Sequence, residues 1–275
     1  MIGGTHPSTG PEVGIVGRDR LTVDLRALGL TAGATVLVHC ALSRIGPVVG
    51  GPATLLAALL DVLGSAGTLV VPTQTAGNSV TSRAFRDATA GMTAAQIAEA
   101  EADIPPFDPD HSPAEGMGVL AEHVRQQRDA VRSRHPETSF AAIGAGATAL
   151  TAVHDLECHL GERSPLGVLY AADAVVLLLG VDYSACTALH LAEYRRRRPA
   201  GNRSYRAYVL DEGRRVCRDF QALDLDDQDF PLIGRVLDDT PFVRMGRVGN
   251  GVCRLIRMRP AVDLAGDWMD EHRGP

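Results

Sequence analysis

The clearest absence from this sequence of 275 residues is lysine, since all 27 basic residues are arginines. The chain therefore cannot use a Schiff-base lysine, the lysine of a phosphate-binding P-loop or a Ser–Lys dyad. Its net charge of −6 argues against nucleic acid as a partner, because such binding depends on neutralising phosphates. A mildly acidic protein is better suited to a cationic ligand.

Cysteine is also scarce, and its spacing forms no C-x-x-C pair. The five cysteines are Cys40, Cys158, Cys186, Cys217 and Cys253. An odd number without this pairing predicts reduced thiols rather than a disulfide framework or a zinc site. No apolar run approaches the roughly 20 residues that span a bilayer, and the N-terminus lacks the charged and apolar regions of a signal peptide. We therefore expect a cytoplasmic protein that binds neither membranes nor metal.

The apolar segments predict an α/β fold with a largely parallel central sheet flanked by helices. Short buried-strand patterns occur at residues 35–40, 68–72 and 175–181, and a helical pattern over 52–63 separates the first two. Strands that are connected through a helix usually lie parallel in one sheet. Near the C-terminus, residues 247–254 predict one further strand.

A hairpin insertion is expected in the second half of the chain. Residues 205–210 and 215–220 flank Asp211-Glu212-Gly213, a strand–turn–strand pattern. The sequence contains neither repeats nor a low-complexity linker, so we expect a single domain over residues 19–275 after a flexible N-terminal segment, residues 1–18.

The strongest candidate for catalysis follows the strand at 175–181. Thr187, His190 and Glu193 are spaced three residues apart within a helix predicted over 187–198, so they lie near one face. A histidine can remove a proton near neutral pH, and a carboxylate one turn away can orient it. The alternative is an ion pair on an exposed helix. A carboxylate-bridged metal site would need a second H-x-x-E motif.

Two further segments could bind phosphate groups. The loop from Ser43 to Gly51 carries several glycines before a helix, and backbone N–H groups at such a position bind anions. It matches neither G-x-G-x-x-G nor the P-loop pattern, and the alternative is an ordinary turn. Arg132 and Arg134, next to His135, could hold a phosphate through their guanidinium groups; the alternative is a solvated turn.

Acidic residues in loops would attract a polyamine, although a solvated acidic face is the alternative. They are Asp108, Asp182, Asp219, Asp224 and Asp226. Cys40 and Cys186 are candidate nucleophiles, but Cys40 fits a strand core and Cys186 has no supporting neighbour apart from His190.

Seven collinear segments resemble the antibiotic N-acetyltransferase family, specifically the aminoglycoside 3-N-acetyltransferases. The resemblance extends from about Leu21 to Met269. Its segments include VLVHCALSRIGPVVGGPATLLAALLDVLGSAGTLVVPTQT, RSRHPETSFAAIG, GERSPLGVLY, TALHLAEYR and VGNGVCRLIRMRPAVDLAGDWM. The resemblance implies one α/β domain that is distinct from the GNAT fold, and direct acetyl transfer without an acyl-enzyme.

The resemblance also implies the role of each site residue. His190 would be the catalytic base, Glu193 its orienting carboxylate, and the hydroxyl of Thr187 would face the same pocket. The cosubstrate acetyl-CoA would lie against a larger set of residues. These are Ser43, Gly46, Val48, Gly50, Gly51, Thr73, Ser112, Arg134 and His135.

The acceptor implied by the resemblance is the 3-amino group of a 2-deoxystreptamine aminoglycoside, whose modification gives antibiotic resistance. Asp219, and less clearly Asp182, would bind this polycationic amine. The segment Asp182–Thr187 departs from the family pattern G-H-D-x-N-T, and Ala76–Ala102 has few aromatics. The alternatives are therefore an acetyltransferase for a different amine in biosynthesis and a non-catalytic ligand-binding homologue. A homodimer is a further possibility.

Overall fold

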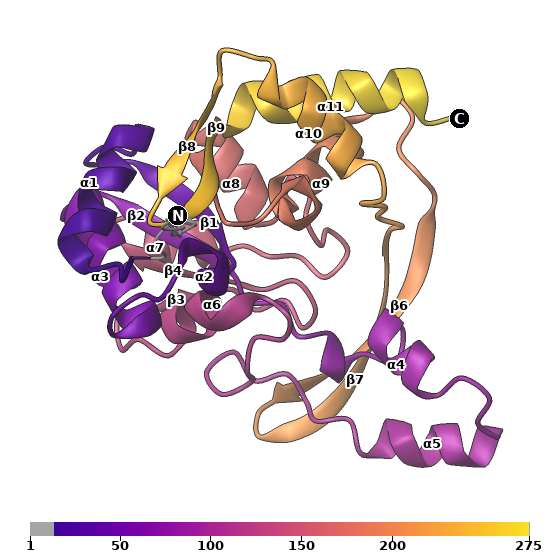
Figure 1. Ribbon diagram of the computed structural model, residues 1–275. Coiled ribbons are helices and arrows are strands. Elements are labelled where there is room, and N and C mark those ends of the chain that lie inside the picture. The colour runs from indigo at the N-terminus through magenta and orange to yellow at the C-terminus, as the bar shows by residue number, and fades with distance from the viewer. Residues whose placement is uncertain (1–13, 275) are drawn as a thin grey trace, which may run out of the picture.

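Three parallel strands form the centre of the molecule. The computed structural model describes residues 14–274. Strand β1 (Thr35–Cys40) lies between β2 (Thr68–Pro72) and β5 (Val175–Leu179) and pairs with both in parallel. The three strands match the buried-strand patterns of the sequence, and because they are parallel their carboxyl ends lie at the same edge of the sheet. Strands β1 and β2 are labelled in Figure 1.

Antiparallel strands extend this centre on both sides into a seven-stranded sheet of order β3-β4-β2-β1-β5-β9-β8. Beyond β2 lie β4 (Phe140–Gly144) and β3 (Val131–Arg132). Beyond β5 lie β9 (Gly251–Arg257) and β8 (Val243–Val248). The single strand predicted over 247–254 is thus wrong. A turn at Gly249 and Asn250 divides it, and Gly249 adopts a φ of 57°, which glycine permits without strain.

Helices cover both faces of the sheet, as the α/β pattern predicted. Side chains alternate along β1, so Val36 and Val38 join the core on one face, whereas Leu37 joins the core on the other. The first face carries α1 (Arg18–Leu28), α3 (Gly51–Leu63) and α6 (Gly118–Arg125). The second face carries α7 (Ala147–Thr151), α8 (Pro165–Ala171), α9 (His190–Arg195), α10 (Phe230–Asp238) and α11 (Met258–His272).

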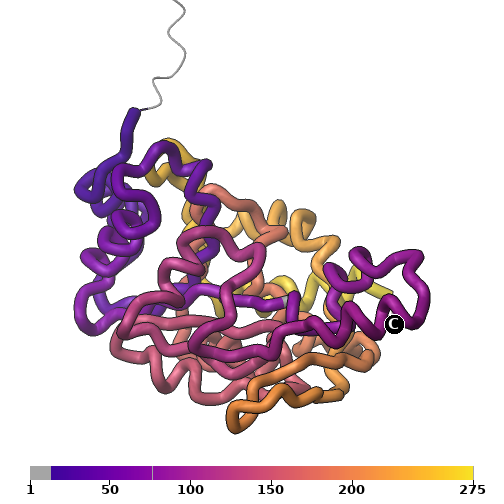
Figure 2. Tube along the Cα trace, turned by 90° about the horizontal axis from the view of Figure 1, so that it is seen from below, coloured from indigo at the N-terminus to yellow at the C-terminus, as the bar shows by residue number. Residues whose placement is uncertain are grey.

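The hairpin forms a separate two-stranded sheet and is longer than predicted. Its strands are β6 (Asn202–Asp211) and β7 (Arg214–Leu223). The turn residues Glu212 and Gly213 both have positive φ, as tight hairpin turns require. Tyr205 and Phe220 stack on the inner side of the hairpin and help to form a small core that includes Leu156. Figure 2 shows the hairpin beside the loop that contributes Leu156.

The remaining elements are short and lie in connections. They are α2 (Leu42–Ile45), η1 (Ala76–Asn78), α4 (Arg83–Ala88), α5 (Ala94–Ala102), η2 (Tyr183–Ala185) and η3 (Thr187–Leu189). None of the helices in the described part of the chain is long and apolar enough to cross a membrane.

Most of the flexible segment expected over residues 1–18, namely residues 1–13, lies outside the described range. Within the described range, Val16 is fully buried and bridges to Val48, and α1 already begins at Arg18. The folded part of the chain therefore begins before the predicted boundary.

Arg132 fixes the long connection between β2 and β4 to the sheet. Its Nε donates to the hydroxyls of Thr73 (3.1 Å) and Ser139 (3.0 Å). The two Nη atoms donate to the carbonyl oxygens of Ser112 and Thr73. Burial, together with the charge of Arg125, lowers the pKa of Arg132 to about 10, so this cation is largely desolvated and depends on these oxygens.

Replacement of Arg132 by Met should lower the free energy of unfolding by about 2–4 kcal/mol, because several buried acceptors lose a charged donor. Arg134→Met is the matched control, since Arg134 is exposed and its replacement should change stability by less than about 0.5 kcal/mol. Urea denaturation measures both variants. Equal losses would contradict the anchoring role of Arg132.

Candidate active site

The predicted trio Thr187, His190 and Glu193 lies together beyond the carboxyl end of β5. Thr187 begins η3 and His190 begins α9, which ends at Arg195 and is therefore shorter than the predicted helix. His190 Nδ1 lies 2.6 Å from Glu193 Oε2. An ionised carboxylate only accepts hydrogen bonds, so Nδ1 donates the proton. This tautomer leaves Nε2 of His190 with a lone pair for proton removal.

Glu193 is held on both of its oxygens although it is only 2% exposed. Oε1 accepts from the backbone N–H of Asp226 (2.8 Å) and from Arg273 Nη1 (2.7 Å). Arg273 in turn pairs with the carboxylate of Asp229. A buried carboxylate is tolerated only when its charge and lone pairs are satisfied. Arg273 therefore fixes the Glu193 carboxylate, whose other oxygen contacts His190.

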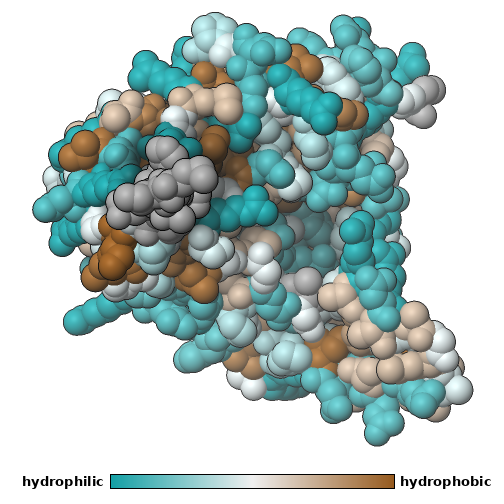
Figure 3. Space-filling view, viewed as in Figure 1, coloured by the Kyte–Doolittle hydropathy of each residue, from teal (hydrophilic) through white to brown (hydrophobic). Residues whose placement is uncertain are grey.

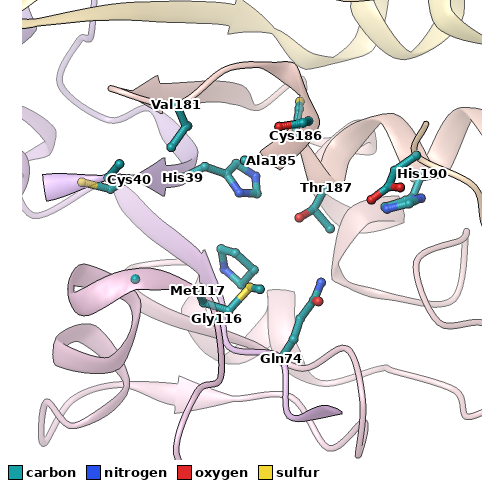
Figure 4. A pocket seen from close by; sticks show the side chains of 15 residues that line it. His39, Cys40, Gln74, Gly116, Met117, Val181, Ala185, Cys186, Thr187 and His190 are labelled. Carbon is teal, nitrogen blue, oxygen red and sulfur yellow. The ribbon is translucent and has the colours of Figure 1, made fainter. Parts of the chain in front are cut away.

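A pocket of about 480 Å³ opens beside this dyad. It lies between the carboxyl ends of the strands and the segment 181–190, and Figure 4 shows His190 and Thr187 on one side with Gln74 and Met117 opposite. The space-filling view shows that the molecule is hollowed at the centre of this face (Figure 3). The wall residues are His39, Cys40, Ala41, Pro72, Gln74, Gly116, Met117, Gly118, Val181, Ser184, Ala185, Cys186, Thr187, His190 and Asp227.

A second pocket of about 460 Å³ adjoins the first and shares Cys40, Ala41 and Gly118 with it. Ser43, Gly46 and Val48 line this second pocket, so three of the predicted cofactor residues lie together. Gly50 and Gly51 follow at the start of α3 and adopt left-handed backbone conformations. The two adjoining pockets together extend from Val48, just before the start of α3, to His190.

The other predicted cofactor residues do not line either pocket. Thr73 is buried and bound to Arg132, and the hydroxyl of Ser112 accepts from the backbone of Asp108. Arg134 is exposed. Thr73 and Ser112 thus contact other parts of the protein, and Arg134 faces solvent.

His135 is a structural residue. It is fully buried, and its Nδ1 accepts from the backbone N–H groups of Glu137 and Thr138 (both 3.1 Å). Nδ1 is therefore unprotonated, and Nε2 donates to Leu156 O at 3.3 Å. The ring also packs on His154 and His159. Burial holds its pKa well below the usual value, so a neutral His135 supports the loops rather than a phosphate.

The predicted acceptor residues lie outside both pockets. Asp219 is exposed and pairs with Arg206 (2.7 Å), which holds its pKa below the usual value. Asp182 caps η2 by accepting from Ser184. Within the described part of the chain, Asp227 is the only acidic wall residue of the dyad pocket. It lies in the acidic stretch from Asp224 to Asp229, where no pattern in the sequence distinguishes it from the other aspartates.

His39 and Gln74 were also missed by the sequence analysis, although a signal was present. His39 lies near the end of β1, and Gln74 follows β2. Sites in open α/β sheets lie outside the carboxyl ends of the strands, so both positions could have been inferred once the parallel order was assumed.

The two cysteines in the pocket wall are unsuited to nucleophilic catalysis. Burial raises the pKa of Cys40 and of Cys186 to about 12, so both thiols keep their protons near neutral pH, and the thiolate is the reactive form. Within residues 14–274 no group of three or more His, Cys, Asp or Glu side chains is arranged to hold a metal ion.

The family model described as aminoglycoside 3-N-acetyltransferase matches residues 37–270, which include both pockets and the dyad. The chain belongs to the aminoglycoside 3-N-acetyltransferase family. It is therefore an acyltransferase of that family, and the resemblance inferred from the sequence segments is confirmed. Aminoglycoside N(3)-acetyltransferase VII of Streptomyces paromomycinus is 41% identical over 278 residues, which cover 95% of this chain and 94% of the relative.

Solved structures of this family share the fold. The aminoglycoside acetyltransferase AAC(3)-Xa superposes with a TM-score of 0.85 and 38% identity, and 94% of each chain is covered. AAC-IIIb, solved as a binary complex with CoASH, superposes with a TM-score of 0.83 and 29% identity over 95% of this chain and all of that chain. The α/β architecture with its hairpin is thus the acetyltransferase architecture that the sequence predicted.

Replacement of Arg273 by Gln should lower kcat by about 10–100-fold, because a carboxylate that loses its fixed partner no longer holds His190 in position. The KM for the acyl donor should not change, since Arg273 lies outside both pockets. Arg197→Gln is the control, as Arg197 is exposed and has no contact with Glu193. Steady-state kinetics are measured below the melting temperature of each variant. A wild-type kcat in both variants would refute the role of Arg273.

Proposed function

We propose that this protein transfers the acetyl group of acetyl-CoA to the 3-amino group of a 2-deoxystreptamine aminoglycoside, and so gives resistance to the antibiotic. The observation that supports this most directly is the position of the His190–Glu193 dyad beside two connected pockets. One pocket contains the loop residues Ser43, Gly46 and Val48, and the other contains the acidic residue Asp227. A donor and an acceptor can therefore approach His190 from different sides.

The choice of acetyl-CoA as the donor is supported by the wall that the two pockets share, which consists of Cys40, Ala41 and Gly118. Acetyl-CoA would place its phosphates near Gly50 and Gly51, where α3 begins, because the N-terminus of a helix attracts anions. Its pantetheine arm would follow Ser43, Gly46 and Val48 to Cys40 and bring the thioester into the dyad pocket. The family relative that was solved with CoASH supports this choice of donor.

The chemistry follows from the tautomer of His190. The unprotonated amine of the acceptor attacks the thioester carbon, and a C–N bond forms while the carbonyl oxygen gains negative charge. His190 Nε2 takes one proton from the attacking nitrogen, and Glu193 stabilises the resulting imidazolium. The carbonyl then re-forms, the C–S bond breaks, and the coenzyme A thiolate accepts the proton from His190. The products are the acetamide and free coenzyme A.

Replacement of His190 by Ala should reduce kcat by roughly two to four orders of magnitude, the usual contribution of a general base. Binding of acetyl-CoA, measured by calorimetry, should persist. His272→Ala is the matched control, because His272 lies at the end of α11 and stacks on Trp268. Turnover is followed as thiol release with a panel of aminoglycosides and simple polyamines.

The outcomes of this assay separate the possible activities. Thiol release with 2-deoxystreptamine antibiotics, abolished in His190→Ala, supports the proposal. Release only with other amines favours the biosynthetic alternative. Acetyl-CoA binding without release for any amine would favour a non-catalytic homologue.

Asp227 supplies the electrostatic contact for the acceptor in this proposal. Asp227→Asn should raise the KM for a cationic acceptor by about 5–50-fold, as expected for the loss of a charge-assisted contact, and should change kcat less. Asp219→Asn is the comparison and should leave the KM unchanged, because Asp219 pairs with Arg206 outside the pocket. A raised KM in Asp219→Asn but not in Asp227→Asn would reverse this assignment.

A further inference from the structure

His39 is a polar residue in a position where the sheet otherwise carries apolar side chains. Along β1, Leu37 and His39 point to the same face, and Leu37 belongs to the core on that face. The residue paired with His39 on β5 is Leu178, which belongs to the same core. The row of core side chains therefore ends in an imidazole at the wall of the dyad pocket.

The imidazole of His39 lacks the hydrogen bonds that a buried polar group normally has. His39 is 5% exposed, and its Nε2 has no hydrogen-bond partner among residues 14–274. Buried polar groups are nearly always paired, and an unpaired one in a native protein requires an explanation. A leucine would satisfy packing here, and the imidazole lies at the wall of the dyad pocket, so the structure points to a ligand in that pocket as its partner.

The ring is neutral, which limits what it can do. Burial, and then the charge of His190, lower the pKa of His39 to about 3. A neutral imidazole offers one N–H donor. His39 therefore cannot compete with His190 as a base or stabilise negative charge as a cation, but it can donate a hydrogen bond. Burial disfavours a second proton on the ring, so the imidazole keeps one N–H and one lone pair.

The position of His39 matches the path of the acyl group. The next two residues, Cys40 and Ala41, line both pockets, so a thioester that passes from one pocket to the other lies beside β1 at this point. Figure 4 shows the His39 ring extending from the end of β1 into the pocket, on the side opposite Met117.

We propose that His39 donates a hydrogen bond to the carbonyl oxygen of the acyl thioester and stabilises the negative charge that this oxygen gains in the transition state. This inference rests on the proposed acetyl transfer. It assigns the two histidines of the pocket to the two charges of the reaction: His190 receives the proton of the amine, and His39 stabilises the oxyanion. Donors aimed at a developing oxyanion contribute strongly in sites that exclude water.

The test compares two substitutions of similar size. His39→Leu removes the donor and should lower kcat by about 100–1000-fold, as loss of an oxyanion donor does, with little change in the Kd for acetyl-CoA. His39→Gln keeps a neutral N–H and should retain more of the kcat than His39→Leu. His159→Leu is the matched control, because His159 Nε2 is likewise buried without a partner, but lies outside both pockets. Its kcat should equal that of the wild type.

A second measurement does not depend on turnover. Isotope-edited infrared spectra of bound acetyl-CoA, labelled with ¹³C at the acetyl carbonyl, report the hydrogen bond to that oxygen. The carbonyl stretch should lie at lower frequency in the wild type than in His39→Leu. If His39→Leu does not fold, the same comparison is made with His39→Gln, whose different donor should shift the band.

The results separate this inference from the proposed function. Equal loss of kcat in the Leu and Gln variants, or identical carbonyl bands in wild type and variant, would overturn the role of His39 while leaving His190 in place. Absence of thiol release in the wild type would overturn the proposed function, and the infrared comparison would still decide whether His39 binds the thioester carbonyl.

Discussion

The interaction on which the site depends is the contact between the buried carboxylate of Glu193 and Arg273. It joins α9 to the residue that follows α11, although the two are 80 positions apart in the sequence. Without Arg273, this buried carboxylate would keep only its contacts with the backbone of Asp226 and with His190, and buried carboxylates need their lone pairs satisfied. With Arg273, the carboxylate is held in place and fixes the His190 tautomer. Catalytic geometry in this chain is therefore a consequence of how its last helix packs.

That packing is supplied by the core on the second face of the sheet. Met258, Ala265 and Met269 of α11 lie in the same core as Leu37 and Leu178 of the central strands. The face of α11 that is buried against the sheet thus determines where Arg273 is placed. A change in this core that shifts α11 would alter the dyad without touching it, because close-packed interiors transmit displacements rather than absorb them.

The sequence predicted the parts of the site that depend on local spacing. Thr187, His190 and Glu193 were identified because residues three apart on a helix share a face, and Ser43, Gly46 and Val48 because a glycine-bearing loop precedes a helix. Arg273 was not identified, since its contact with Glu193 is set by tertiary packing. The orientation of the Thr73 hydroxyl likewise depends on a distant donor, Arg132. The Ser112 hydroxyl accepts instead from the backbone N–H of Asp108, four residues away.

The orientation of Asp219 can be predicted from strand alternation. Phe220 is apolar and faces the inner side of the hairpin, so strand alternation directs Asp219 to the opposite side. The structure confirms this orientation through the Arg206–Asp219 pair. No comparable argument was available for Asp227, which lies in an irregular segment. The central sheet was predictable because buried strands are encoded in continuous apolar runs, whereas irregular segments that form pocket walls carry no such periodicity.

The segment from Asp226 to Asp229 joins the wall of the dyad pocket to the partners of Glu193. The backbone of Asp226 donates to Glu193, Asp227 lines the pocket, and the carboxylate of Asp229 pairs with Arg273. In the proposed function, an ammonium group held by Asp227 would therefore restrain the same few residues that fix Glu193. Because these contacts share one short segment, binding of a cationic acceptor and alignment of the base would then be energetically coupled. A neutral amine of the same size would lack that coupling, and the pocket would then bind it without ordering the dyad to the same degree.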